Sequence, residues 1–218
     1  MRCGQSSASV RRHPALLLDR SRNLRLASSP VDGVVRILLV SGSLREGSTN
    51  TAVLRTAGEV APANVKTVLY AGMGSLPHFN PDSDREGEPV VPAVRHLREQ
   101  IAAADAILIC TPEYAGALPG ALKNLLEWTV GDGSTYRKPV AWINASGPAA
   151  PTGAADAHAS LRKVLGYVHA DIVENACARV SVARDVVGPE GSITDEPIRQ
   201  QISAALDTLA NYAKEVRV

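Results

Sequence analysis

The feature that most constrains the fold is a regular alternation of apolar, β-branched segments with amphipathic ones. Each apolar segment reads as a short buried strand and each amphipathic one as a helix that packs against a sheet. Parallel strands need crossover helices, so this order predicts a doubly wound α/β sheet with helices on both faces. The expected strands are 34–40, 65–70, 106–110, 139–145 and a short fifth within 172–182; the expected helices are 50–60, 93–104, 116–128, 158–168 and one that begins after Thr194 or Asp195.

Composition excludes several classes of protein. The formal charge is only +1 and aromatic residues make up 4%, which argues against a nucleic-acid surface and against a platform for base stacking. The apolar runs are too short to span a bilayer. The cysteines Cys3, Cys110 and Cys177 form neither a disulfide framework nor a zinc pattern. We therefore expect a cytoplasmic protein, with Cys110 as a small core residue.

Residues 1–32 differ from the rest of the chain, because arginine and serine recur there without an amphipathic pattern. A secretory signal would need a longer apolar stretch. An organelle transit peptide and a flexible extension both suit this composition, and we favour the flexible extension. The folded domain is expected to span 33–218.

The first loop joins the first strand to a helix, a place where free N–H groups and the helix dipole favour an anion. Its gap between Gly42 and Gly47 resembles a Walker A loop, but Ser48 stands where the lysine would be. The dinucleotide pattern G-x-G-x-x-G is missing as well. A single phosphomonoester fits best, and the alternative is a capping turn without a ligand. The residues expected to bind the phosphate are Ser41, Gly42, Ser43, Arg45, Ser48, Thr49 and Asn50.

The pattern G-S-x-R-x-x-S-x-N in this loop resembles the flavin-phosphate loop of the NADPH-dependent FMN reductases. The resemblance extends over residues 34–183 and implies a flavodoxin-like sheet of five strands in the order 2-1-3-4-5. It implies FMN as cofactor, NADPH or NADH as co-substrate, and ping-pong hydride transfer through the flavin to a small-molecule acceptor: a flavin, quinone, azo dye or metal ion. It also implies a homodimer or homotetramer. The chemistry belongs to the cofactor, so no catalytic side chain is predicted.

The second loop, after the third strand, is similar to the family segment P-E-Y-N-x-x-x-P-G-x-L-K-N-x-x-D-W, which flanks the flavin ring. Ala115 stands where the family has asparagine, and Glu127 where it has aspartate. For Glu113 a solvated charge is a simpler interpretation than catalysis. The residues expected to bind the cofactor are Pro112, Glu113, Tyr114, Ala115 and Gly116.

The third loop follows the fourth strand, and by resemblance it lies at the edge of the ring. Ser146 and Gly147 match the family, whereas prolines replace part of its glycine-rich form and remove backbone donors. Segment 76–82 also resembles the family, and we expect it to form a subunit contact together with helix 116–128. A metal site at His78, Asp82 and Asp84 lacks a second histidine or a cysteine, so we expect a solvated loop there.

Other functions remain open at this stage. A flavodoxin-type electron carrier or a redox sensor would bind FMN without nicotinamide turnover. A hydrolase of the nucleophile-elbow type would need G-x-S-x-G, which does not occur.

Overall fold

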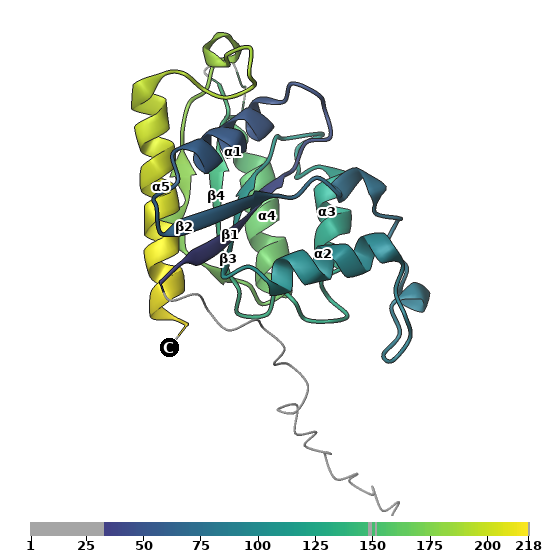
Figure 1. Ribbon diagram of the computed structural model, residues 1–218. Helices are drawn as coiled ribbons and strands as arrows, with labels where there is room; N and C mark the ends of the chain where they lie inside the picture. The colour runs from purple at the N-terminus through teal and green to yellow at the C-terminus, as the bar shows by residue number, and fades with distance from the viewer. Residues whose placement is uncertain (1–32, 148–149, 151, 218) are drawn as a thin grey trace, which may run out of the picture.

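The computed structural model describes residues 33–217 except 148, 149 and 151, so the extension expected over residues 1–32 lies outside the described residues. The described residues form one parallel sheet in the order β2-β1-β3-β4-β5, which confirms the predicted doubly wound, flavodoxin-like order (Figure 1). Its four longer strands are β1 (Val35–Ser41), β2 (Val65–Leu69), β3 (Ala106–Cys110) and β4 (Pro139–Asn144).

The fifth strand position is divided into two short strands, where a single one was predicted. Strands β5 (Asp171–Ile172) and β6 (Ala178–Arg179) both pair with β4, and the 3-10 turn η3 (Glu174–Ala176) separates them. Val173 and Ala176 in this interval are buried in the core, so the chain leaves the ladder without leaving the protein interior.

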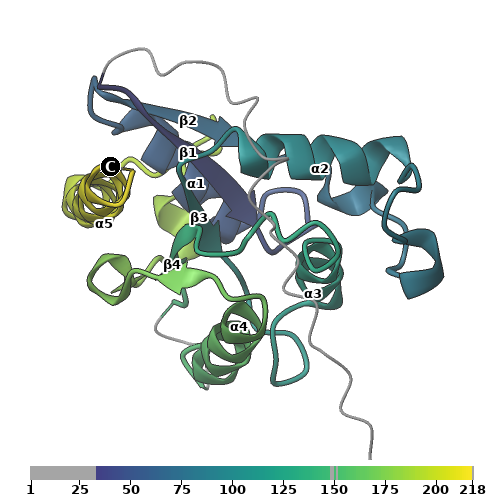
Figure 2. The same cartoon turned by 90° about the horizontal axis from the view of Figure 1, so that it is seen from below.

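Five helices cover the two faces of the sheet (Figure 2). Helices α1 (Thr49–Glu59) and α5 (Glu196–Glu215) lie on one face. Helices α2 (Pro92–Ala102), α3 (Gly120–Glu127) and α4 (Ala155–Tyr167) lie on the other. The sheet is thus buried on both sides, which explains why its strands read as continuous apolar runs.

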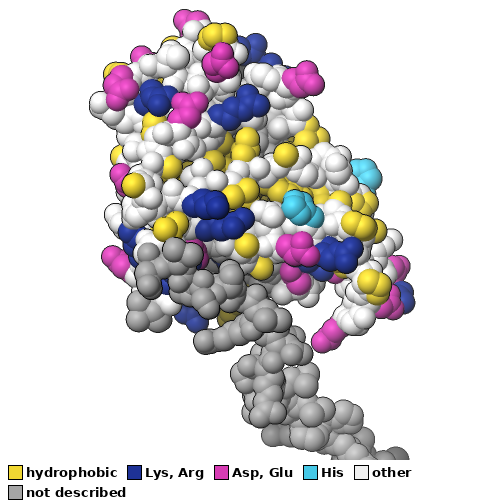
Figure 3. Space-filling view, viewed as in Figure 1, with side chains coloured by type: hydrophobic (Ala, Val, Ile, Leu, Met, Phe, Trp, Pro, Cys, Tyr) yellow, Lys and Arg dark blue, Asp and Glu magenta, His cyan; other side chains and the backbone are white. Residues whose placement is uncertain are grey.

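Strand β1 shows how one sequence serves both cores. Ile37 and Leu39 pack toward α1 and α5, whereas Leu38 and Val40 pack toward α2, α3 and α4. Successive side chains of a strand point to opposite faces, so this alternation is expected of a central strand. Outside these cores, the face that carries β2 and α2 shows apolar side chains interspersed with charged ones (Figure 3).

Several predicted helix boundaries were wrong by a few residues. Helix α1 begins at Thr49 with Ser48 as N-cap, not Thr49 or Asn50. Helix α3 begins at Gly120 rather than residue 116, because the preceding turn is left-handed and Pro119 takes the N-cap position. Helix α4 begins at Ala155, earlier than predicted. Asp195 caps α5 as expected, and its carboxylate accepts a hydrogen bond from Ile198 N.

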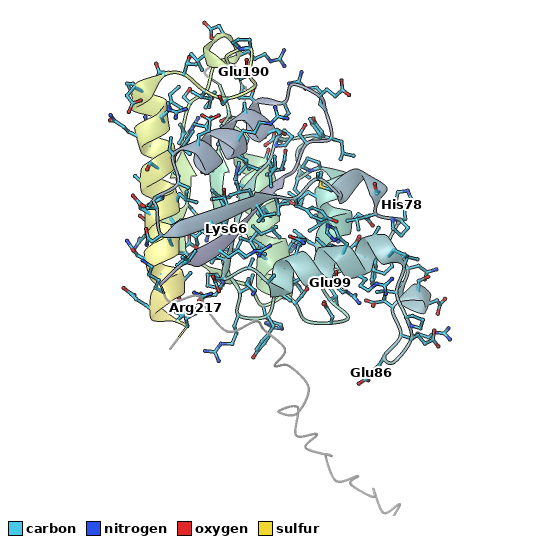
Figure 4. The ribbon with its side chains drawn as sticks, in the orientation of Figure 1. Lys66, His78, Glu86, Glu99, Glu190 and Arg217 are labelled. Atoms are coloured by element: carbon cyan, nitrogen blue, oxygen red, sulfur yellow. The ribbon has the colours of Figure 1, made fainter. Side chains whose placement is uncertain are left out.

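The segment between β2 and α2 contains only two 3-10 turns, η1 (Met73–Ser75) and η2 (Pro81–Ser83), yet it is firmly attached to α3. Asn124 accepts from Phe79 N at 2.8 Å and donates to Pro77 O at 2.9 Å, and Trp128 Nε1 donates to the same carbonyl oxygen at 2.9 Å. The family motif residues Asn124 and Trp128 therefore hold this loop. His78 and Glu86 show how far the segment extends from the sheet (Figure 4).

A nearly buried ion pair fixes the same segment farther along. Arg98 on α2 donates to the Asp84 carboxylate at 2.7 Å and to Trp128 O at 2.8 Å. Asp82 pairs with Arg85 at 3.0 Å. Two of the three residues considered as metal ligands thus make ion pairs with arginines, and the described residues contain no cluster of three groups able to hold a metal ion.

The segment between β6 and α5 packs over α1. It contains the 3-10 turn η4 (Arg184–Val186), and Glu190 marks its outer loop, at the opposite end of the molecule from Arg217 (Figure 4). Thr56, fully buried on α1, joins the two elements: its hydroxyl donates to Ala52 O at 2.8 Å and accepts from Ile193 N at 2.8 Å.

We expect Thr56→Val to lower the free energy of unfolding by about 1–3 kcal/mol, because it keeps the volume but leaves the buried Ile193 N–H without an acceptor. Thr208→Val is the matched control, since the half-buried Thr208 makes the same bond within its helix, to Ala204 O at 2.9 Å, and has no second partner among the described residues. Chemical denaturation of both variants measures the difference. Equal effects would contradict a special role for the bond to Ile193.

Candidate functional site

A cleft of about 730 Å³ opens at the carboxyl ends of the strands, where parallel α/β sheets bind ligands. Its size lies in the range of pockets that hold small organic ligands. All three predicted loops contribute to it, together with the segment after β6. The lining residues are Ser43, Arg45, Ser48, Thr49, Asn50, Thr111, Pro112, Glu113, Tyr114, Ala145, Ser146, Gly147, Ala150, Thr152, Ala154, Val182, Ala183 and Arg184.

The first loop is shaped by bonds of its own. Ser41 Oγ lies 2.9 Å from Thr51 Oγ1 and accepts from Ser43 N at 3.3 Å. Gly42 N donates to Cys110 O at 2.8 Å, and a Cβ at Gly42 would lie 2.1 Å from Thr111 Oγ1. Ser41 and Gly42 therefore support the loop from behind and are not among the residues that line the cleft.

The N-terminus of α1 faces the cleft and is left open by its own cap. Ser48 has the extended backbone of an N-cap, but its side chain makes no capping hydrogen bond. The N–H groups of the first turn therefore remain suited to an anion. Arg45 adds a cation that is exposed to solvent, with Nη2 3.3 Å from Gly47 O.

A buried thiol supports Asn50 in this wall. Cys110 Sγ donates to Asn50 Oδ1 at 3.3 Å, which leaves the amide NH₂ of Asn50 free of that contact. Burial raises the pKa of the Cys110 thiol far above its ordinary value, so the group stays a neutral thiol. Cys110 is a core residue, as predicted.

The second loop forms a tight turn in which Tyr114 and Ala117 exchange backbone hydrogen bonds. Ala115 and Gly116 occupy the turn with φ of 51° and 70° and are not among the residues that line the cleft. Tyr114 is half exposed, and its hydroxyl lies 3.5 Å from Ser43 Oγ. Its ring therefore forms a flat wall that reaches toward the first loop.

The third loop is held by a cluster of polar bonds to Gly153. Asn144 Nδ2 and Ser146 Oγ both donate to Gly153 O, at 2.8 and 2.9 Å. Gly147 lies against the next segment, because a Cβ there would meet Val182 O at 3.1 Å. Ser146 and Gly147 line the cleft, and cofactor binding by them remains a prediction.

Glu113 joins the second loop to the third, a contact that the interpretation as a solvated charge did not foresee. Its carboxylate accepts from Thr152 Oγ1 at 2.7 Å and from Ala157 N, in the first turn of α4, at 3.1 Å. The bond from Thr152, followed by those from backbone amides of α4, holds the pKa of Glu113 below its ordinary value. The group is therefore a carboxylate at neutral pH.

Some lining residues are not among those predicted, chiefly Thr152 and Val182 to Arg184. Only the loops after the first, third and fourth strands were considered as candidates. The rule that ligands sit beyond the carboxyl ends of strands applies equally to the segment after the fifth strand position, and it would have found Arg184.

The comparisons with known proteins agree with this geometry. Residues 35–184 match the family model described as NADPH-dependent FMN reductase. The chain belongs to this family. The family confirms FMN and NAD(P)H as the cofactor and co-substrate predicted from the sequence, and it makes the protein an oxidoreductase.

Individual relatives match this chain over nearly their full length. The chain is 34% identical over 185 residues to an NAD(P)H-dependent FMN reductase of Pseudomonas aeruginosa, which covers 84% of this chain and 97% of the relative. It is 29% identical over 188 residues to a quinone reductase of Escherichia coli K12, with coverages of 84% and 98%. Among solved structures, the flavoenzyme NAD(P)H:(acceptor) oxidoreductase FerB of Paracoccus denitrificans superposes with a TM-score of 0.72 at 28% identity, covering 84% of this chain and 98% of that one.

Ala115 provides a test of the turn beside Tyr114. We expect Ala115→Gly to raise the free energy of unfolding by roughly 0.5–1 kcal/mol, because a left-handed L-residue costs more than the extra entropy of an unfolded glycine. Ala204→Gly, at an exposed position inside α5, should instead lower it by about 1 kcal/mol. Thermal or chemical denaturation gives both values, and a loss of stability in both variants would contradict the strain at Ala115.

Proposed function

We propose that the cleft binds FMN with its phosphate at the N-terminus of α1 and its ring between the second and third loops. The observation that carries this proposal is the open N-terminus of α1, bordered by Arg45, Ser43 and Asn50. These donors suit a phosphate monoester without a metal ion. The predicted residues that do not line the cleft, Ser41, Gly42, Ala115 and Gly116, support the loops from outside.

When bound, FMN supplies two-electron chemistry: it takes a hydride from a nicotinamide and passes the electrons to a second acceptor at the same place. The residues of this chain bind and orient the two ligands in turn. Tyr114 provides a flat wall, and small residues of the third loop leave room beside it. Since the relatives named above include a quinone reductase, we infer that the acceptor is a quinone or a flavin.

Two expectations from the sequence accompany this proposal. A homodimer or homotetramer remains a prediction, as does the cytoplasmic location. The described residues contain no helix that is both long and apolar enough to cross a membrane.

The phosphate placement is tested with Arg45→Gln. Because Arg45 would meet the phosphate and not the ring, we expect FMN affinity to fall by about tenfold or more while riboflavin affinity stays unchanged. Arg55→Gln is the control, since Arg55 is an exposed arginine of α1 outside the cleft. Fluorescence titrations with both flavins give the dissociation constants, and an equal loss for the two flavins would contradict this placement.

The order of the reaction is tested by steady-state kinetics with NADPH and a soluble benzoquinone. If one site serves both substrates in turn, double-reciprocal plots at several fixed quinone concentrations are parallel. Intersecting lines would contradict alternate use of one site. Flavin binding without NADPH oxidation would favour an electron carrier instead.

A further inference from the structure

Two helix N-termini border the described part of the cleft. Only one of them donates a hydrogen bond to a carboxylate of the described residues. Thr49 and Asn50 bring the N-terminus of α1 to the cleft, and Ala154 brings that of α4. At α1 no side chain of the cap bonds the first turn. At α4 the Glu113 carboxylate lies against the first turn, and its Oε2 accepts a hydrogen bond from Ala157 N.

Helix α4 has an unusual start that explains its need for an outside cap. Its N-cap residue, Ala154, is left-handed with φ of 59° and has no side-chain acceptor. Caps of this kind leave the first N–H groups without partners. Glu113 supplies the missing acceptor from another loop, and a carboxylate there is also favoured by the helix dipole.

Thr152 extends this contact into the third loop. Its hydroxyl donates to Glu113 Oε1 at 2.7 Å and accepts from Ala154 N at 3.2 Å. Thr152 and Ala154 flank Gly153. The carbonyl oxygen of Gly153 accepts hydrogen bonds from the side chains of Asn144 and Ser146. The Glu113 carboxylate is therefore bonded to the two elements that form one wall of the cleft.

We propose that Glu113 is a positioning residue for the flavin ring: its carboxylate holds the third loop and the start of α4 in place. This inference rests on the proposed placement of FMN. It assigns Glu113 neither contact with the reacting atoms nor transfer of a proton.

The test measures dissociation constants of FMN and riboflavin for the wild type, Glu113→Gln, Glu113→Ala and Thr152→Val. We expect Glu113→Ala to weaken both flavins by a similar factor, about tenfold, because the contact lies at the ring end. Glu113→Gln should lose less flavin affinity than Glu113→Ala, since the amide oxygen of the glutamine still accepts one hydrogen bond. The double variant Glu113→Ala/Thr152→Val should lose less affinity than the sum of the two single losses, because both changes remove the bond between Glu113 and Thr152.

Glu174→Ala is the matched control. Glu174 is also a carboxylate bonded to α4, through Arg162, but it does not line the cleft. We expect its dissociation constants to equal those of the wild type. A loss in Glu174→Ala as large as in Glu113→Ala would show general loosening of α4 and contradict the proposal.

A pH profile of riboflavin binding separates positioning from mere stability, because riboflavin has no phosphate to titrate. The contribution of the charged Glu113 is present above its ordinary pKa and is lost as pH falls through the lowered value. Thr152→Val removes the largest cause of the lowering, so the loss should begin at higher pH, whereas Glu113→Gln should lack this step. His158 on α4 also faces Glu113, and its own titration remains in Glu113→Gln and can be subtracted.

The outcomes distinguish the two proposals. A wild type that binds neither flavin would contradict both the proposed function and the role of Glu113. A wild type that binds both flavins, with Glu113→Ala and Glu113→Gln unchanged in affinity and in pH profile, would contradict the role of Glu113 alone.

Discussion

The site depends on the parallel pairing of β1 with β3, the two central strands whose loops lead in opposite directions over the sheet. The register that joins Ser41 to Cys110 continues one step beyond the strands, where Gly42 N donates to Cys110 O. Gly42 then passes so close to Thr111 that no Cβ fits between them. This contact sets the separation of the first and second loops, and with it the distance between the anion-binding end and the wall at Tyr114.

Much of the fold follows from the sequence, because strands buried on both sides have a distinctive composition. Strand β3 was predicted with the bounds that the structure shows. The predicted start of a helix was less accurate where a turn precedes the helix. The apolar stripe that begins at Leu118 suggested a helix from residue 116, but Leu118 is buried without being helical. The left-handed conformation of Ala115 carries no sequence signal, since alanine normally favours helices.

The candidate site was predictable as far as its residues follow strands directly. Ser43, Arg45 and Tyr114 belong to such loops, and they line the cleft. Arg184 was within reach of the same rule, because it follows the fifth strand position. The bonds of Glu113 and the placement of the Arg184 segment over α1 were not predictable in this way, because contacts between distant residues set them. The segment that carries Arg184 is held over α1 by the bond from Ile193 N to Thr56, between residues separated by 137 positions. No local pattern encodes a contact of that kind.

The loop between β2 and α2 shows how firmly an irregular segment can be attached while its tip stays free. Asn124 and Trp128 hold its first half, and Arg98 holds Asp84. Residues 85–89, between these anchors and α2, are exposed to solvent. Lengthening the chain at Gly87 would disturb none of the anchors, so this tip is the natural place to graft an epitope or a reporter domain without altering the flavin cleft.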